Sequence, residues 1–286
     1  MRFLILRKAD LRTEQGVMPG ADLLAAMGSY NRQLTDAGVM RGGAGLRPSA
    51  EGARLTLGDG DPVVTHGPFP DTGELVAGFS VFEADSREQA IEWIRRWPAQ
   101  DVDGELTVEI RESGCPDGCA EVRPSSAAPG GGRYVVLLRS SPALEAELPV
   151  AQERLDRLDA HNAAEAAKGV LVAADGLRSS ARATRVHFKA GKAASVVDGP
   201  FTEIKELIAG YWLIRAGSLA DAIEWAKRNP YPTGPRVDVE IRPLYEPQDF
   251  APAFTADLRA AEERMRAAQL ESGLHARLPG ATPRAS

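Results

Sequence analysis

The sequence is poor in cysteine and histidine, the side chains that most often build disulfide frameworks and metal centres. Two of the 286 residues are cysteine and four are histidine. Cys115 and Cys119 are separated by three residues in a Gly/Pro-rich stretch, with no second Cys/His pair nearby. Structural zinc needs four ligands, so we interpret the two cysteines as an incidental loop pair, with a reversible disulfide as the alternative. We expect no metal and no other cofactor.

The start of the chain lacks an apolar run long enough for a signal peptide or a membrane span. Residues 3–6 are only four consecutive apolar residues before charge returns, which predicts a first β-strand instead. The formal net charge is −6 at pH 7, and no long run of Lys or Arg occurs. We therefore expect a cytoplasmic protein with no nucleic-acid partner and no membrane partner.

Motifs of several large enzyme classes are also missing. The sequence contains no Gly-x-Ser-x-Gly elbow, no phosphate-binding loop and no His-Glu-x-x-His motif. The pieces "GGAG" and "GGG" are typical of turns and linkers.

The sequence does contain the same unit twice. "RFLILR" (2–7) resembles "RYVVLL" (133–138), and "QAIEWIRRWP" (89–98) resembles "DAIEWAKRNP" (221–230). Gly-Pro-Phe occurs at 67–69 and again at 199–201, and the offset stays at 131 or 132. Such spacing indicates a collinear duplication. We expect a first repeat (1–112), a linker (113–132), a second repeat (133–247), and a C-terminal helix with a tail (248–286).

Each repeat has the same predicted order of elements. A strand is followed by an amphipathic helix, a hairpin, a long strand that begins after Gly-Pro-Phe, a second helix and a last strand. Ser86 and Ser218 are natural N-caps of the second helices, and Pro98 and Pro230 end them. With the hairpin arms merged, the order is βαββαβ, the ferredoxin-like α+β plan.

The long strand is apolar on both faces. In the second repeat, Leu207, Ala209, Tyr211 and Leu213 alternate with Ile208, Gly210, Trp212 and Ile214. A strand with one wet face would alternate apolar and polar residues. Two helices cover only one side of a sheet, so we expect the other repeat to cover the second side, sheet against sheet.

The last strand of the second repeat carries a polar row. Val237, Val239 and Ile241 alternate with Asp238, Glu240 and Arg242, which face solvent or line a wet pocket between the sheets. Solvent is the more common environment for such a row. Arg242 and Arg111 either hold an anionic ligand or pair with neighbouring glutamates, and we favour pairing.

These segments resemble the YCII-related family, in its DGPF-domain branch. The resemblance is carried by "YNRQLTDAGV…GLRPS" in the first repeat and by "DGPFTEIKELIAGYW…AIEWAKRNP…VEIRP" in the second. It implies a dimeric α+β barrel of two facing ferredoxin-like sheets with a possible site in the cleft, built here within one chain. The protein would then be a monomeric pseudo-dimer or a homodimer. Activity in the family is largely unassigned, and a His–Asp pair in relatives implies acid–base chemistry.

The candidate catalytic residues lie beside the Gly-Pro-Phe turns and on the first helices. Asp198 precedes the second turn, where it either accepts backbone N–H bonds or acts as a general base. His66 replaces it in the first repeat. His161 is the histidine that the repeat alignment suggests as the partner of Asp198, and Tyr30 with His66 is the mirrored pair. The structural alternatives are an exposed histidine on the helix flank for His161 and a solvent-facing turn histidine for His66.

Further residues are candidates for ligand binding. Asn31 and Asn162 lie within the apolar stripes of their helices, where a strand carbonyl or a ligand must satisfy the amide. Glu206 begins the long strand, where a salt bridge with Lys205 is the structural alternative. The full set is Tyr30, Asn31, Asn162, Phe201, Glu206 and Arg242.

Three functions are compatible with these patterns. The first is a cofactor-independent enzyme that performs acid–base chemistry on a small organic molecule in a cleft between the repeats. The second is a non-catalytic module that binds a small molecule or a protein. The third is a monooxygenase-like member of the wider α+β barrel group.

Overall fold

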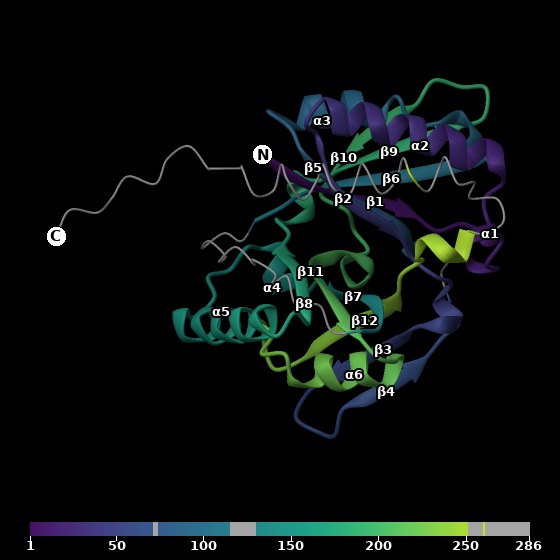
Figure 1. Cartoon of the computed structure of the whole chain (residues 1–286). Coiled ribbons are helices and arrows are strands. Elements are labelled where there is room, and N and C mark those ends of the chain that lie inside the picture. Colours follow the sequence, from purple (N-terminus) through teal and green to yellow (C-terminus); the bar gives the residue numbers. More distant parts are fainter. Residues whose placement is uncertain (71–73, 115–129, 251–259, 261–286) are drawn as a thin grey trace.

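The chain forms two six-stranded antiparallel sheets that face each other, with helices on the outside (Figure 1). The computed structural model describes residues 1–70, 74–114, 130–250 and 260. Helices α2 and α3 cover one sheet, and α5 and α6 cover the other. The predicted C-terminal helix and both cysteines lie outside the described residues. Among the described residues, no helix has the length and apolar character to cross a membrane.

The two halves repeat one order of elements. The first half contains β1 (Arg2–Lys8), α1 (Leu11–Glu14), α2 (Ala21–Asp36), β2 (Met40–Gly45), η1 (Ser49–Glu51), β3 (Ala53–Leu57), β4 (Val63–His66), β5 (Val76–Glu83), α3 (Arg87–Ile94), η3 (Ala99–Asp101) and β6 (Glu105–Glu112). The second half contains β7 (Gly132–Arg139), α4 (Pro142–Glu145), α5 (Gln152–Ala167), β8 (Leu171–Gly176), η4 (Ser180–Arg182), β9 (Thr184–Lys189), β10 (Ser195–Asp198), η5 (Ile204–Glu206), β11 (Ile208–Ala216), α6 (Leu219–Arg228), β12 (Val237–Pro243) and η6 (Pro247–Phe250).

The helices form where the sequence predicts them. Ser86 and Ser218 cap α3 and α6 by accepting backbone N–H bonds from residues three positions later. Gly38 and Gly169 follow α2 and α5 with φ of 71° and 73°, in the left-handed region that glycine adopts at little cost. The apolar stripe of α5 that contains Asn162 is its buried face: Leu155, Leu158, Asn162 and Ala166.

The hairpins are exchanged between the halves. One sheet has the order β10-β9-β6-β1-β5-β2 and the other β4-β3-β12-β7-β11-β8. Each sheet therefore combines four strands of its own half with the hairpin of the other half. The exchanged strands pair over their full length, Glu105 to Ile110 with β9 and Val237 to Ile241 with β3. This exchange joins the halves through backbone hydrogen bonds as well as through side-chain packing.

Backbone hydrogen bonds also connect the two sheets at two corners. Tyr245 donates to Gly45 (2.9 Å) where β12 ends beside β2. Arg178 donates to Glu112 (2.9 Å) where β8 ends beside β6. The eight strands other than the hairpins thus follow one another around a closed circuit.

Three apolar layers result. The α2/α3 layer and the α5/α6 layer each pack on the outer face of one sheet. The third layer lies between the sheets and combines residues of both halves: Leu4, Leu6, Val76, Phe79, Val135, Leu137, Ile208 and Tyr211. The predicted two-faced long strand is present, with one difference. A bulge between Ile208 and Gly210 shifts the alternation, so Ile208 shares the inner face with Tyr211 and Ala209 packs on the helix side.

The repeated Gly-Pro-Phe turns are tight because they close against the other elements of their own half. A Cβ at Gly199 would lie 1.8 Å from the carbonyl oxygen of Ser180, and a Cβ at Gly67 would lie 1.9 Å from that of Ser49. The Phe69 N–H donates to Ser49 Oγ (3.1 Å), and the Phe201 N–H donates to Ser180 Oγ (3.2 Å). Glycine is therefore required at the first position of each turn by space.

We expect Gly199→Ala to destabilise the protein by about 2 kcal/mol, because the added methyl group must displace backbone. Gly60→Ala is a suitable control, since a Cβ there meets nothing within 4 Å. Urea unfolding at neutral pH measures both. An equal stability of the two variants would contradict the close approach at Gly199.

Candidate functional site

The space between the sheets contains buried charge as well as apolar side chains. Glu109 and Arg111 of β6, and Glu240 and Arg242 of β12, are each 0% exposed. The solvent-facing interpretation of the last strands is therefore wrong for these residues. They face the interior because the exchanged hairpins and the opposite sheet cover them.

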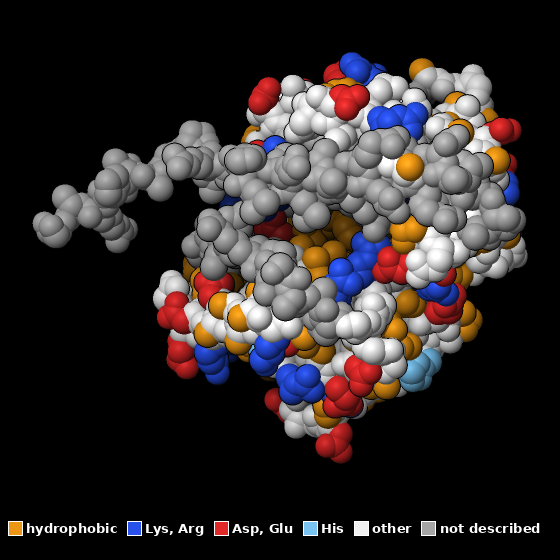
Figure 2. Space-filling model, in the orientation of Figure 1, with side chains coloured by type: hydrophobic (Ala, Val, Ile, Leu, Met, Phe, Trp, Pro, Cys, Tyr) orange, Lys and Arg blue, Asp and Glu red, His pale blue; other side chains and the backbone are white. Residues whose placement is uncertain are grey.

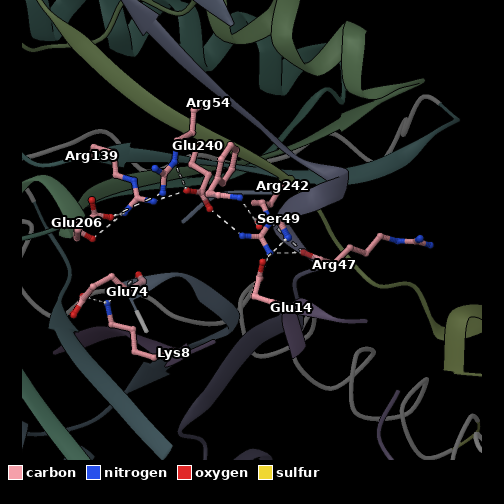
Figure 3. A network of polar contacts seen from close by, with 11 residues as sticks. Lys8, Glu14, Arg47, Ser49, Arg54, Glu74, Arg139, Glu206, Glu240 and Arg242 are labelled. Atoms are coloured by element: carbon pink, nitrogen blue, oxygen red, sulfur yellow. Dashed lines mark hydrogen bonds and ion pairs between the residues drawn. The ribbon is translucent and has the colours of Figure 1, made fainter. Parts of the chain in front are cut away.

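The first cluster, the Glu240 network, consists of Glu240, Arg139, Arg54, Arg242, Glu206 and Glu14. Three guanidinium groups donate to the Glu240 carboxylate: Arg54 (3.1 Å), Arg242 (3.0 Å) and Arg139. Figure 3 shows Arg139 reaching Glu240 from one side and Arg242 from the other. Arg242 also donates to Glu14 (3.2 Å), and Arg139 donates to Glu206 (3.4 Å). Every charge in this cluster has an opposite charge beside it.

The second cluster, the Glu109 network, is its counterpart and consists of Glu109, Lys8, Arg185, Arg111, Glu74 and Glu145. Arg185 donates to Glu109 (2.9 Å), and Lys8 Nζ lies 3.3 Å from both Glu109 and Glu74. Arg111 donates to Glu109 (3.3 Å) and lies 3.8 Å from Glu145. The two clusters match at the repeat offset, except that Lys8 stands where the second half has Arg139.

The electrostatics of the two central carboxylates are alike. Burial by itself would raise the pKa of Glu109, but the positive charges of Lys8, Arg111 and Arg185 lower it to about 2. Burial is likewise outweighed at Glu240, where Arg139, Arg242 and Arg54 lower the pKa to about 2. Both carboxylates are firmly ionised and surrounded by donors, which makes them poor general bases at neutral pH.

The networks hold the halves together. In the Glu240 network, Glu14 and Arg54 come from the first half and the other members from the second. Arg54 also stacks on Phe69, 4.3 Å from the ring centre, and Arg185 stacks on Phe201 at 4.2 Å. Each Gly-Pro-Phe turn thus supports, within its own half, the arginine that pairs with the buried glutamate of the other half.

A shallow hollow of about 360 Å³ beside the Glu109 network is lined by Thr107, His187, Lys189 and Lys192 among others. His187 Nδ1 and Thr107 Oγ1 are hydrogen-bonded (2.9 Å), and Lys189 pairs with Glu105. Burial lowers the pKa of His187. The polar side chains of this hollow therefore form their hydrogen bonds and ion pairs mainly with neighbouring residues of the chain.

A different group of polar side chains lies at the apolar part of the inter-sheet space. Asp175 of β8 is directly opposite Tyr211 of β11, so both side chains share the inner face. The side chain of Asp175 is 12% exposed, and its Oδ2 lies 3.8 Å from Arg2 Nη1 of the facing sheet. The Tyr211 ring lies 6.0 Å from the Phe79 ring, which also belongs to the facing sheet. A carboxyl, a phenol and a guanidinium thus meet between the two sheets.

Asp175 and Tyr211 have apolar counterparts in the first half. The matching pair on β2 and β5 is Ala44 opposite Phe79. Burial raises the pKa of Asp175, which Arg2 lowers to a smaller extent. Burial also raises the pKa of Tyr211, and the charge of Asp175 adds to that. The carboxyl therefore holds its proton to a higher pH than an exposed aspartate does.

The molecular surface is hollowed between the two layers (Figure 2). Hydrophobic side chains form the bottom of this hollow, and basic and acidic side chains lie at its rim. The apolar residues between the sheets that retain partial exposure are Ala44, Val81, Ala173 and Leu213. Leu213 and Ala173 are neighbours of Tyr211 and Asp175 along their strands.

The structure does not bring the predicted pair His161 and Asp198 together. His161 is on α5, outside the second sheet, where its ring packs on Trp225 (5.7 Å) and burial lowers its pKa. Asp198 ends β10 at the edge of the other sheet, where it accepts from Thr184 (2.7 Å) and lies 3.5 Å from Arg87. The two side chains lie against the outer faces of different sheets, so this geometry offers no proton transfer between them.

The mirrored candidates are separated in the same way. Tyr30 on α2 is buried and donates to the Trp93 carbonyl oxygen (3.0 Å), whereas His66 is exposed on β4 of the other sheet. Asn162 Oδ1 accepts a hydrogen bond from the Trp212 indole N–H (3.2 Å). This side-chain donor differs from the expected strand carbonyl, which would have accepted from the Asn162 amide nitrogen. Asn31 is half-buried on α2. These four residues lie outside the inter-sheet space.

Three predicted ligand-binding residues are associated with the networks: Glu206 and Arg242 are members, and Phe201 contacts the member Arg185. Phe201 stacks under Arg185, and Glu206 pairs with Arg139 instead of Lys205. Arg242 pairs with Glu240, as the pairing interpretation predicted. Sequence reasoning missed Asp175 and Tyr211, although the repeat alignment sets them against Ala44 and Phe79.

The comparison with protein families agrees with this duplicated arrangement. A model of the YCII-related domain matches residues 1–112 and again residues 133–245. The chain belongs to the YCII-related family. Its two matched segments coincide with the two halves that exchange hairpins, and they include Asp175, Tyr211 and both networks.

Other comparisons add little about this YCII-related protein. None of the curated proteins compared with it matches. A solved structure described as a crystal structure study of an anthrone oxidase-like protein is 15% identical, and the match covers 93% of this chain and 84% of that one. Its TM-score is 0.29, which supports no conclusion about fold or activity.

Proposed function

We propose that this YCII-related protein is a cofactor-independent enzyme that transfers a proton on a small organic molecule held between its two sheets. Asp175 is the proton-transfer group, and Tyr211 is the hydrogen-bond donor beside it. The main observation in support is that this polar pair occupies the inner face at positions where the other half has Ala44 and Phe79. Packing between the sheets does not require polar groups there.

The proposal relocates the acid–base pair that the sequence suggested. His161 and Asp198 lie against the outer faces of different sheets, whereas Asp175 and Tyr211 are neighbours on one inner face. A general base works best when its pKa lies near the working pH. Burial moves the pKa of Asp175 in that direction.

In the proposed step, the Asp175 carboxylate takes a proton from a C–H bond next to a carbonyl group of the bound molecule. The electron pair of that bond moves toward the carbonyl oxygen, to which the Tyr211 hydroxyl donates a hydrogen bond. The proton returns from Asp175 to the same carbon atom as the electron pair moves back from the carbonyl oxygen. The step consumes no oxidant, reductant or cofactor.

The architecture that supports this site is, in our proposal, an intramolecular dimeric α+β barrel from the DGPF-domain branch of the family. The strand orders β6-β1-β5-β2 and β12-β7-β11-β8 are those of two ferredoxin-like repeats. The corner hydrogen bonds between β2 and β12 and between β8 and β6 close the circuit. One chain thereby acquires two unlike halves, and only the second carries the Asp–Tyr pair.

Proton exchange tests this function directly. In D2O, proton NMR follows the loss of the C–H signal next to the carbonyl in a panel of small ketones and keto acids, including cyclohexanone and phenylpyruvate. We expect the wild-type protein to accelerate exchange of at least one probe. Asp175→Ala should lower the rate by about 100-fold or more, and Tyr211→Phe by about tenfold, the loss of one hydrogen bond.

Both substitutions install the residue of the other half, so the fold should tolerate them. Asp198→Ala tests the alternative site and is expected to keep the exchange rate. Loss of exchange in Asp198→Ala with retention in Asp175→Ala would overturn the proposal. Binding of the probes without exchange would identify a non-catalytic binding module.

A further inference from the structure

Arg2 and Arg133 occupy matching positions at the start of β1 and β7, but their surroundings differ. Arg133 donates to both carboxylate oxygens of Glu246 (2.7 and 3.0 Å) and to the Tyr245 carbonyl (3.3 Å). A bidentate pair of this kind satisfies most of the guanidinium fork. The second half therefore uses its arginine to bind its own chain.

Arg2 is not occupied in this way. Among the described residues its ion-pair partner is Asp175, and the two groups lie 3.8 Å apart, longer than a hydrogen bond. Its side chain is 45% exposed. The guanidinium thus lies at the edge of the inter-sheet space, and no carboxylate of the described part of the chain is within hydrogen-bond distance of it.

The surroundings of Arg2 are those of a site for a molecule with one charged end. Leu4 is on the same face of β1, and Val81, Ala173 and Leu213 are apolar residues between the sheets that keep partial exposure. The Tyr211 hydroxyl forms no hydrogen bond among the described residues. Hence two donor groups, Arg2 and Tyr211, border an apolar space, and no described residue supplies an acceptor at hydrogen-bond distance for either of them.

We infer that the molecule bound between the sheets is a small organic acid whose carboxylate is held by Arg2 and whose apolar part lies between the sheets. The inference rests on the proposed function, since it names the class of molecule on which Asp175 and Tyr211 would act. Arg2 is a binding residue in this assignment and takes no part in proton transfer. The paired fork of a guanidinium fits a planar carboxylate, whereas an uncharged amide offers only one acceptor oxygen.

A charge-matched ligand series tests the class of molecule. The probes are acetate, phenylacetate, 3-phenylpropanoate and 4-phenylbutanoate, each with its amide, titrated into the full chain by ligand-observed NMR and calorimetry. We expect at least one phenyl-substituted acid to bind ten times more tightly than its amide. Acetate should bind more weakly than that acid, because it leaves the apolar space empty.

Two substitutions of Arg2 test whether its guanidinium is the source of the preference for the acid over the amide. Arg2→Gln should abolish the preference for the acid while leaving the amide affinity unchanged, and Arg2→Lys should keep part of the preference through its charge. Arg2 is half-exposed, so an unchanged melting temperature should accompany both variants. Retention of the full acid preference in Arg2→Gln would overturn the inference.

The outcomes separate the inference from the proposed function. Equal binding of acids and amides that is lost in Asp175→Ala and Tyr211→Phe would refute the carboxylate anchor and leave the proposed site standing. Acid binding that needs Arg2 but is unaffected by Asp175→Ala and Tyr211→Phe would support the anchor and refute the proton-transfer pair. No binding of any probe to the wild-type protein would overturn both.

Discussion

Replacing Arg242 by methionine is expected to destabilise the protein by about 3–5 kcal/mol, the usual cost of removing one partner from a buried ion pair. Arg242 is 0% exposed and donates to Glu240 (3.0 Å), to Glu14 (3.2 Å) and to the Arg47 carbonyl (3.1 Å). The substitution leaves the Glu14 carboxylate and the Arg47 carbonyl without this donor in a poorly solvated place. Urea unfolding at pH 7, followed by circular dichroism, measures the loss.

The internal repeat supplies a matched control. Arg111 is the counterpart of Arg242, is equally buried and donates to the Arg178 carbonyl (2.8 Å), but its carboxylate contacts are looser: Glu109 at 3.3 Å and Glu145 at 3.8 Å. Its Nε has no hydrogen-bond partner among the described residues. Arg111→Met should therefore cost less than Arg242→Met. A loss below about 1 kcal/mol in Arg242→Met, or a larger loss in Arg111→Met, would contradict a supporting role of the Glu240 network.

The parts of the fold that depend on local pattern could be predicted from the sequence. The duplication, the caps Ser86 and Ser218, and the buried stripe of α5 follow from residues near one another in the chain. The hairpin exchange could not be predicted. A hairpin pattern fixes which two strands pair with each other, but it does not fix which sheet they join, because β3 and β9 offer the same alternation to either sheet.

The buried charge escaped prediction for a related reason. A polar row on a strand normally indicates a wet face, and Glu240 is neutralised by Arg54, which is 186 positions away in the sequence. Only the exchange of hairpins brings Arg54 next to β12. The same hairpin exchange places Arg185 of β9 within hydrogen-bond distance of Glu109.

The candidate site illustrates the value and the limit of comparing the repeats. His161 and Asp198 attracted attention because their residue types suit acid–base chemistry, yet His161 lies on a helix outside one sheet and Asp198 lies on the edge strand of the other. Asp175 and Tyr211 differ from their counterparts Ala44 and Phe79 on the face that the two halves share. A difference between repeats points to a site only when the face on which it lies is known.

We expect the free energy of unfolding to fall strongly at low pH, because the two buried glutamates become protonated. The pKa values of Glu109 and Glu240 are about 2 in the folded protein, below the value of about 4.3 of an unfolded glutamate. A folded pKa below the unfolded one gives a stabilisation that is complete above pH 4.3 and is lost as the pH falls toward 2. Each carboxylate then contributes on the order of 3 kcal/mol at neutral pH.

The measurement is a series of urea unfolding curves between pH 7 and pH 2 for the wild type and for Glu240→Gln. The glutamine cannot ionise, and it leaves Arg139, Arg54 and Arg242 without their shared carboxylate. We expect the variant to be less stable at pH 7 and to lose less stability on acidification, so that the two curves converge near pH 2. Parallel curves across this range would show that Glu240 has the same pKa in the folded and the unfolded chain, and the carboxylate would then be no anchor of the two halves.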